Sequence, residues 1–228
     1  MIEVVSATRF SKREFWEKSP LGLSLKRLSG DERLKSFITF ENRLGLPEIY
    51  NARINAKNDR DVLIFVHDDV WLDDYFLADR VIEGLGAYDI IGVAGNRRRV
   101  ENQPSWAFKD RVGQSFTWDD KANLSGSIAC GAVPFGNVNY YGPAPAECEL
   151  LDGMFLALKK QKILEKRVLF DPLFDFHFYD MDFCRSARAK ELHIGTWPIC
   201  MTHQSQGGAF NTEAWIKKYL AYIDKWAG

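Results

Sequence analysis

The stretch VLIFVHDD, residues 62–69, is the clearest strand in the chain and decides the fold class. Its first five residues are apolar and do not alternate with polar ones, which predicts a strand covered on both faces, as in a parallel sheet. Open α/β sheets bind their ligands beyond the carboxyl ends of the strands. His67, Asp68 and Asp69 stand at that end, so we expect a functional site there.

The segments around this strand alternate between strand and helix patterns. Further strands are predicted at 2–7, 35–40 and 89–94, and helices at 11–17, 46–58 and from Asp73 or Asp74 to about Leu85. Ser11 and Glu14 form a capping-box pattern at the start of the first helix, and Pro20 is expected to break it. This alternation predicts an α/β protein of three layers, with helices on both sides of a mainly parallel central sheet.

The pattern changes after about residue 95. Residues 96–148 are rich in Gly, Asn, Ser, Pro and Trp, and we expect loops and short strands there. Strands are then predicted at 150–158 and 192–198, and helices at 161–166, 179–190 and 212–226. The last helix is amphipathic, with Trp215, Tyr219, Tyr222 and Ile223 as its apolar stripe. We find no internal repeat or linker and expect a single domain over residues 1–228.

Composition excludes several classes of protein. The 228 residues carry a net charge of −1, which provides no overall field for nucleic acid or an anionic membrane. The four cysteines lack a C-x-x-C spacing, so neither a disulfide framework nor a structural zinc site is expected. No signal peptide or membrane span is predicted, and we expect a soluble cytoplasmic protein. Phosphate-loop, dinucleotide-binding and G-x-S-x-G motifs are absent from the sequence.

Two acidic motifs are candidates for chemistry. The carboxylates of Asp68 and Asp69 suit a divalent cation that bridges a diphosphate, although one of them capping the next helix is the competing interpretation. Asp180 and Asp182 lie at a predicted helix start, where one side chain can face a cleft while the other caps the helix. A carboxylate among aromatic residues can act as a general base, whereas acids at a helix start also simply favour the helix dipole.

Weaker signals come from single residues. His203 follows the last predicted strand, and a lone histidine is more often structural than a ligand. Asp152 precedes a glycine, for which a turn is the simplest explanation. Aromatic residues in the middle segment either stack on a sugar ring or pack a small core of their own; they are Trp106, Phe108, Trp118, Tyr140 and Tyr141.

Taken in order, these motifs resemble those of nucleotide-diphospho-sugar transferases with the GT-A fold, and most of all bacterial glycosyltransferase family-2-like proteins. The resemblance covers about residues 2–208. FVHDDV at 65–70 stands where the family has its metal-binding D-x-D, and LDGMF at 151–155 matches the acceptor-side strand. FYDMDF at 178–183 stands where the family has its catalytic E-D-x-D segment, and His203 falls where several such enzymes have a metal-binding histidine.

The resemblance implies roles for individual residues. Asp69 and His203 are expected to bind Mn²⁺ or Mg²⁺, and Asp180 to act as the catalytic base, with Asp182 as the alternative base. The nucleotide sugar is assigned to Thr8, Glu41, Asn51, His67, Asp68 and Asp152. Two positions depart from the family pattern, because His67 replaces the first aspartate of D-x-D and Tyr179 replaces the glutamate before Asp180.

The function implied is a metal-dependent glycosyltransferase that moves a sugar from a nucleotide-diphosphate donor, UDP favoured, to a saccharide or glycolipid acceptor with inversion. Residues 1–95 would form the nucleotide-sugar half and residues 96–228 the acceptor half, with 96–148 closing over the donor. Two alternatives stay open: a non-catalytic sugar-nucleotide or glycan-binding module, and a metal-dependent hydrolase using His67, Asp69 and His203. A homodimer and a peripheral membrane contact are further expectations; a nucleic-acid partner is not expected.

Overall fold

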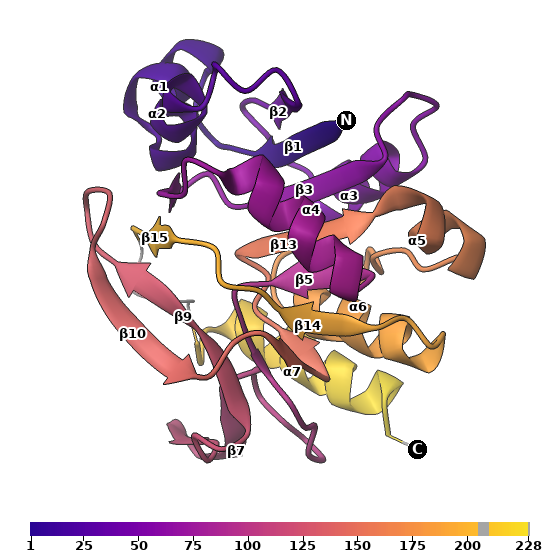
Figure 1. The fold of residues 1–228 in the computed structure, drawn as a ribbon. Coiled ribbons are helices and arrows are strands. Elements are labelled where there is room, and N and C mark those ends of the chain that lie inside the picture. Colours follow the sequence, from indigo (N-terminus) through magenta and orange to yellow (C-terminus); the bar gives the residue numbers. More distant parts are fainter. Residues whose placement is uncertain (205–209, 228) are drawn as a thin grey trace.

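The central sheet is mainly parallel, as predicted. A computed structural model describes residues 1–204 and 210–227, and within them seven strands pair in the order β11-β14-β5-β13-β3-β1-β2 (Figure 1). These strands are β1 (Ile2–Ala7), β2 (Leu34–Thr39), β3 (Val62–Val66), β5 (Ile90–Gly92), β11 (Ala146–Glu147), β13 (Phe155–Lys159) and β14 (Ile194–Thr196). Five of them run in one direction, whereas β11 and β13 run in the other. Strand β13 falls largely within the strand predicted at 150–158, but its antiparallel direction and its place between β3 and β5 are not evident from the sequence pattern.

Helices cover both faces of this sheet, so the three-layer prediction is also confirmed. The helices are α1 (Lys12–Lys18), α2 (Pro20–Arg27), α3 (Leu46–Ile54), α4 (Leu77–Ala87), α5 (Lys160–Lys166), α6 (Tyr179–Ala189) and α7 (Glu213–Lys225). Figure 1 shows α4 in front of the sheet and α3 and α6 behind it. No helix among the described residues is both long enough and apolar enough to cross a membrane.

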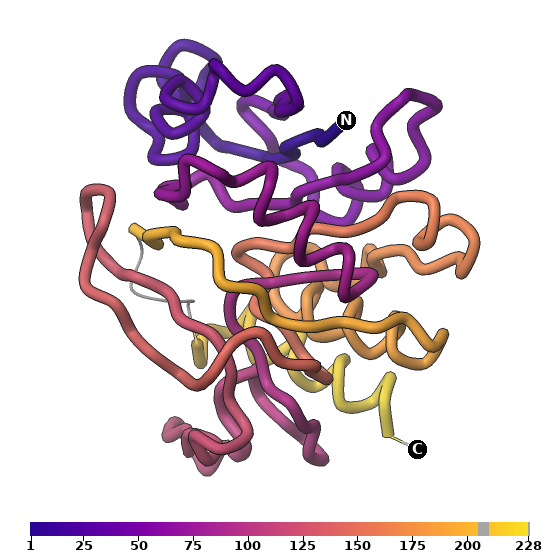
Figure 2. The backbone as a smooth tube through the Cα atoms, viewed as in Figure 1, coloured from indigo at the N-terminus to yellow at the C-terminus, as the bar shows by residue number. Residues whose placement is uncertain are grey.

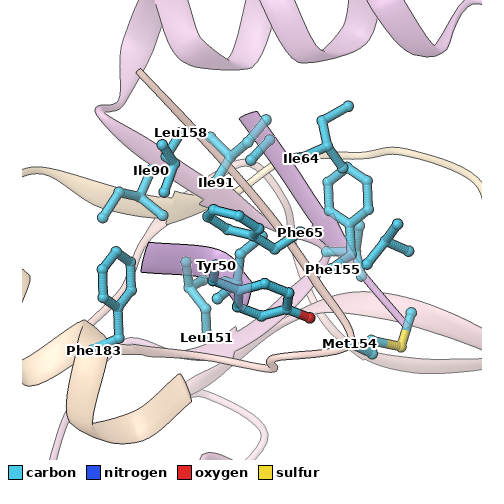
Figure 3. Packing of buried hydrophobic residues seen from close by; sticks show 14 of the residues in the cluster. Tyr50, Ile64, Phe65, Ile90, Ile91, Leu151, Met154, Phe155, Leu158 and Phe183 are labelled. Carbon is cyan, nitrogen blue, oxygen red and sulfur yellow. The ribbon is translucent and has the colours of Figure 1, made fainter. Parts of the chain in front are cut away.

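Aromatic packing supports strand β3 from the side of α3 and α6. The ring of Tyr50 stacks on Phe65 with centroids 4.3 Å apart, and Phe170 stacks on Phe183 at 3.9 Å. Figure 3 shows Tyr50, Phe65 and Phe183 converging in the core. All four rings are buried, and each contributes roughly 1.5–3 kcal/mol through the apolar surface it removes from water. The end of β3 next to His67 is therefore supported by a layer of closely packed aromatic rings.

A second sheet takes its two longest strands from residues 96–148, where loops and short strands were predicted. Within the described residues its order is β12-β6-β9-β15-β4, with β10 paired to β9. The strands are β4 (Val70–Leu72), β6 (Ala94–Asn96), β9 (Leu124–Cys130), β10 (Asn137–Gly142), β12 (Leu150–Leu151) and β15 (Met201–His203). A separate hairpin joins β7 (Phe108–Val112) to β8 (Ser115–Trp118). Figure 2 shows the hairpin of β9 and β10 as a long loop along one side of the molecule.

Gly126 allows strands β9 and β6 to pair. It has a φ of +92°, and a Cβ atom would lie 1.9 Å from the carbonyl oxygen of Val93. The sequence pattern missed this sheet because its strands include glycines and polar residues and do not alternate regularly.

Several element boundaries also differ from the predictions. Pro20 starts α2 at its first position, where a missing N–H costs nothing, instead of only ending α1. Helix α3 ends at Ile54, earlier than expected. Asp73 and Asp74 do not cap α4, which begins at Leu77 without a side-chain cap. The Asp73 carboxylate instead accepts a hydrogen bond from the Thr202 hydroxyl at 2.6 Å.

The short strand β4 decides where His203 lies. It follows β3 after the turn at 67–69 and pairs antiparallel with β15, so that His203 stands opposite Val70. The backbone N–H of Gln204 also donates to the carbonyl oxygen of Asp69 at 2.9 Å. This register places a residue from near the end of the chain beside the carboxyl end of β3.

Candidate functional site

A cavity of about 950 Å³ lies at the carboxyl end of β3, where the two sheets meet. Its volume is at the upper end of the roughly 300–1,000 Å³ typical of small-molecule sites. One part of its wall is polar and contains His67, Asp69, Asp152, Asp180 and His203. Aromatic side chains line the rest, among them Trp106, Phe108, Trp118, Tyr140, Tyr141 and Trp215.

Three of the polar residues are close enough to share one metal ion. Ligand atoms of His67, Asp69 and His203 all lie within 4.8 Å of one another. His203 Nε2 is 3.2 Å from Asp69 Oδ2, and both side chains are largely buried. Burial opposes protonation of His203, but the hydrogen bond and charge of Asp69 outweigh it and raise the pKa of His203.

The donor set of this triad fits a divalent metal. Imidazole nitrogen and carboxylate oxygen are common ligands of divalent metals. A set of three protein ligands leaves further positions for other ligands, as catalytic metal sites require.

A chain of hydrogen bonds orients the ring of His67. His67 Nε2 lies 2.8 Å from the hydroxyl of Tyr179, and that hydroxyl donates to the carbonyl oxygen of Gly153 at 2.7 Å. A carbonyl can only accept, so the single proton of Tyr179 is committed to Gly153. His67 Nε2 must then be the donor toward Tyr179, and Nδ1 keeps its lone pair. Burial lowers the pKa of His67.

Asp180 faces the cavity from the first turn of α6. Its Oδ2 accepts a hydrogen bond from the backbone N–H of Gly153 at 2.9 Å. Burial, and secondly the nearby charge of Asp152, raise the pKa of Asp180 to about 7. A carboxyl group with such a pKa can exchange a proton near neutral pH.

Asp152 joins the polar wall to the aromatic one. Its Oδ2 accepts from the indole Nε1 of Trp106 at 2.6 Å, and its Oδ1 accepts from the backbone N–H of Met154 at 2.8 Å. The aromatic residues singled out in the sequence thus form a cavity wall as well as packing against one another.

Other predicted site residues lie at the edge of the sheet but outside the cavity lining. Thr8 follows β1, Glu41 follows β2, and Asp68 follows β3, so the three share the carboxyl edge of adjacent parallel strands. The Thr8 hydroxyl donates to the carboxylate of Asp68 at 2.5 Å. Glu41 is exposed.

Asn51 and Asp182 are engaged elsewhere. The Asn51 side chain donates to the carbonyl oxygen of Phe170 and accepts from its N–H, at 2.7 and 2.9 Å. Asp182 is fully buried and pairs with Lys225 and Trp226 of the C-terminal segment at 2.8 and 2.9 Å. Neither lines the cavity, and the structure does not bring them to the metal triad.

The contributions of Tyr179 and Gly153 were not predicted. The only sequence signal was the tyrosine that replaces the family's glutamate. A Cβ atom on Gly153 would lie 2.5 Å from the Tyr179 hydroxyl and 2.7 Å from Asp180 Cβ, so this position needs glycine. Residue spacing alone does not show such contacts, because they join segments 26 and 27 residues apart.

Comparison with known proteins shows the fold. No protein-family model matches the sequence, and no curated protein matches it. The catalytic domain of Drosophila beta1,4galactosyltransferase 7, in a complex with xylobiose, is similar with a TM-score of 0.52 and 11% identity over 96% of this chain and 79% of that one. A mutant of the Drosophila enzyme in a complex with manganese, UDP-Gal and xylobiose gives 0.50 and 9% identity over 93% and 78%. The chain therefore has the GT-A fold of glycosyltransferases.

Proposed function

We propose that the protein is a metal-dependent glycosyltransferase that transfers a sugar from a nucleotide diphosphate, UDP favoured, to a saccharide-type acceptor with inversion. One observation carries the proposal. In a GT-A fold, a His–Asp–His triad and the partly buried carboxyl group of Asp180, whose pKa is raised to about 7, line the same cavity at the carboxyl end of β3.

Asp180 is proposed as the base. It would accept the proton of an acceptor hydroxyl as that oxygen attacks the anomeric carbon and the bond from that carbon to the diphosphate oxygen breaks. Its contact with the Gly153 N–H holds the carboxylate at the cavity wall. Asp182 is not proposed as the base, because it is buried against Lys225 outside the cavity.

Asp69 and His203 are proposed to hold Mn²⁺ or Mg²⁺, which when bound neutralises the charge that develops on the leaving diphosphate. The Drosophila enzyme whose structure contains manganese and UDP-Gal has the same fold. In this chain, Asp69 directly precedes β4 and His203 ends β15, so the antiparallel pairing of these two strands of the second sheet sets their separation.

The aromatic wall is proposed as the acceptor side. Trp106, Trp118 and Tyr141 offer flat apolar faces, and Asp152 offers carboxylate oxygens for sugar hydroxyl groups. The part of the carboxyl edge of the central sheet that carries Thr8, Glu41 and Asp68 is proposed to receive the nucleoside. Closure of 96–148 over the donor stays a prediction. The cytoplasmic location, the homodimer and a peripheral membrane contact also stay predictions.

The decisive experiment is calorimetric titration of UDP, GDP, dTDP and CDP, each with Mn²⁺ and with EDTA. We expect one nucleotide, UDP first, to bind only with metal, and Asp69→Asn to abolish that binding. Asp224→Asn, at an exposed position of α7, is the matched control and should bind as the original chain does. Absence of metal-dependent nucleotide binding would contradict the proposal.

A hydrolase is the second candidate, because two histidines and one carboxylate also suit a hydrolytic metal. Incubation of UDP-sugars with and without a panel of saccharide acceptors separates the two activities. Product formation that depends on an acceptor supports the transferase. Fast hydrolysis that acceptors do not change supports the hydrolase, and binding without either product supports a binding module.

A further inference from the structure

We propose that His67 is a third protein ligand of the metal, bound through Nδ1, and that the site therefore selects a transition metal such as Mn²⁺, Co²⁺ or Zn²⁺ over Mg²⁺. This inference builds on the metal site of the proposed function. It changes the role of His67, which the family resemblance assigns to the nucleotide.

The hydrogen-bond chain supports the use of Nδ1. Since the carbonyl oxygen of Gly153 accepts the hydrogen bond of the Tyr179 hydroxyl, and the Tyr179 oxygen accepts that of His67 Nε2–H, Nδ1 is the ring nitrogen left to bind a metal. A histidine whose other nitrogen donates to a fixed acceptor is the usual arrangement of a metal ligand. The backbone carbonyl of Gly153 thus determines the tautomer of His67 through two successive hydrogen bonds.

The packing around His67 also limits its movement toward a nucleotide. Its ring stacks near that of Phe176 with centroids 6.0 Å apart, and it lies 6.3 Å from the ring of His203. The backbone N–H of His67 is bound to the carbonyl oxygen of Met154 at 3.0 Å. The ring is therefore held on the same wall as Asp69 and His203.

The donor chemistry determines which metal is preferred. A D-x-D motif supplies carboxylate oxygens, which suit Mg²⁺ and Mn²⁺ alike, whereas imidazole nitrogen suits later transition metals. Two imidazoles and one carboxylate raise affinity along the series from Mn²⁺ through Co²⁺ toward Zn²⁺. Mg²⁺ prefers oxygen ligands and keeps several waters, so it gains little from His67 and His203.

The test is metal binding by the full chain without nucleotide. After treatment with EDTA and its removal, Mg²⁺, Mn²⁺, Co²⁺ and Zn²⁺ are titrated by calorimetry, and Co²⁺ binding is also followed by its visible absorption. We expect Co²⁺ to bind at least about tenfold more tightly than Mg²⁺. His67→Asp should reduce that ratio by about tenfold, because it restores a carboxylate at this position.

Two further variants separate ligation from folding. His67→Phe keeps an aromatic ring beside Phe176 but has no nitrogen, and should weaken Co²⁺ binding at least about tenfold and alter its absorption bands. Tyr179→Phe leaves His67 in place but removes its acceptor, and should weaken Co²⁺ binding by about 10- to 100-fold. Tyr219→Phe is the matched control, because it loses a similar hydroxyl-to-carbonyl bond, to Asn102, away from the triad.

The outcomes distinguish this inference from the proposed function. If His67→Phe folds and binds Co²⁺ with unchanged affinity and spectrum, His67 is not a ligand, even if metal-dependent UDP binding persists. Unchanged binding by Tyr179→Phe would overturn the role of Tyr179 in fixing the tautomer of His67. If the metal preference depends on His67 but no nucleotide binds, the ligand assignment stands and the transferase proposal fails. Equal affinity of the original chain for Mg²⁺ and Co²⁺ would overturn the selectivity.

Discussion

At the residue scale, the chemistry of the site depends on the protonation state of Asp180. Burial and the neighbouring carboxylate of Asp152 both disfavour its charged form and raise its pKa from an ordinary 3.8 to about 7. A base acts only when it is deprotonated, so only part of the protein is competent at neutral pH. The same shift affects stability, because the folded state favours the protonated carboxyl group.

We therefore predict that kcat/KM for sugar transfer rises as the pH increases through about 7. Asp180→Asn should reduce the rate by about 10²- to 10⁴-fold above pH 7 and remove this pH dependence, because the variant has no base to deprotonate. The stability that Asp180 contributes in its protonated form is lost as the pH rises from about 4 to about 7, so Asp180→Asn should be more stable than the original chain at pH 8. Initial rates and melting temperatures from pH 5.5 to 8.5 measure both effects. A flat pH–rate profile would contradict the role of the base.

A substitution at Gly153 tests the close packing behind the site. Gly153→Ala would place a methyl group against the Tyr179 hydroxyl and Asp180 Cβ, so both side chains must move. We predict a loss of stability of about 1–3 kcal/mol and a fall in activity of about 100-fold. Gly86→Ala is the control, because a Cβ atom there meets nothing within 4 Å. Full activity of Gly153→Ala would show that Tyr179 and Asp180 need not lie where they do.

At the element scale, helix α7 fixes the start of α6. Phe178, the residue before α6, has a φ of +65°, a conformation that costs a non-glycine residue of order 1–3 kcal/mol. Three residues of α7 hold its ring: Trp215, Tyr219 and Tyr222, with centroids 5.2–5.7 Å away. The predicted apolar stripe of α7 thus supports the turn that presents Tyr179 and Asp180 to the cavity.

The contact of Asp182 with Lys225 gives a testable prediction for α6 and α7. Asp182→Asn removes the charge that pairs with Lys225 and should change the free energy of unfolding by less than about 1 kcal/mol near neutral pH, because burial raises the pKa of Asp182 and disfavours its charged form despite that ion pair. The cost is limited because Lys225 is partly exposed and keeps its ion pair with Asp171. Denaturant unfolding measures the change. Transfer by the folded variant should stay within a few-fold of the original rate, whereas a loss of 100-fold or more with unchanged stability would make Asp182 the base.

At the scale of the whole molecule, the proposed metal site joins the two sheets. His67 follows a strand of the central sheet, and His203 ends a strand of the second sheet. A ligand that binds only the folded state stabilises it by about 2.7 kcal/mol at 100 times its Kd. For a chain of 228 residues this corresponds to an increase of about 5–10 °C in melting temperature.

We therefore predict that saturating Mn²⁺ or Co²⁺ raises the melting temperature by about 5–10 °C and that EDTA reverses the increase. His203→Ala should remove the effect, because only one of the two sheets would still contribute ligands. His193→Ala is the matched control, since His193 is an exposed histidine away from the cavity. Differential scanning calorimetry measures the shift. An equal increase in melting temperature for His203→Ala and His193→Ala would show that the metal binds elsewhere.

The sequence by itself determined the α/β class, the parallel strands β1, β2 and β3, most helices and the motif order of the GT-A fold. These features depend on local periodicity, capping and the polar residues that follow apolar strands, all of which are properties of neighbouring residues. His67, Asp68 and Asp69 could be placed at a strand end for the same reason.

Only the tertiary structure decided which candidates meet. The insertion of β13 between β3 and β5, the assembly of the second sheet from strands between residues 70 and 203, and the pairing of β4 with β15 all depend on contacts between distant segments. Those contacts bring the His203 side chain beside that of Asp69 and link Tyr179 to His67 by a hydrogen bond. They also direct Asp180 toward the cavity, whereas Asp182 packs against α7. The reason is physical: local spacing determines the direction of a side chain on its own element, but only packing between elements determines what that side chain reaches.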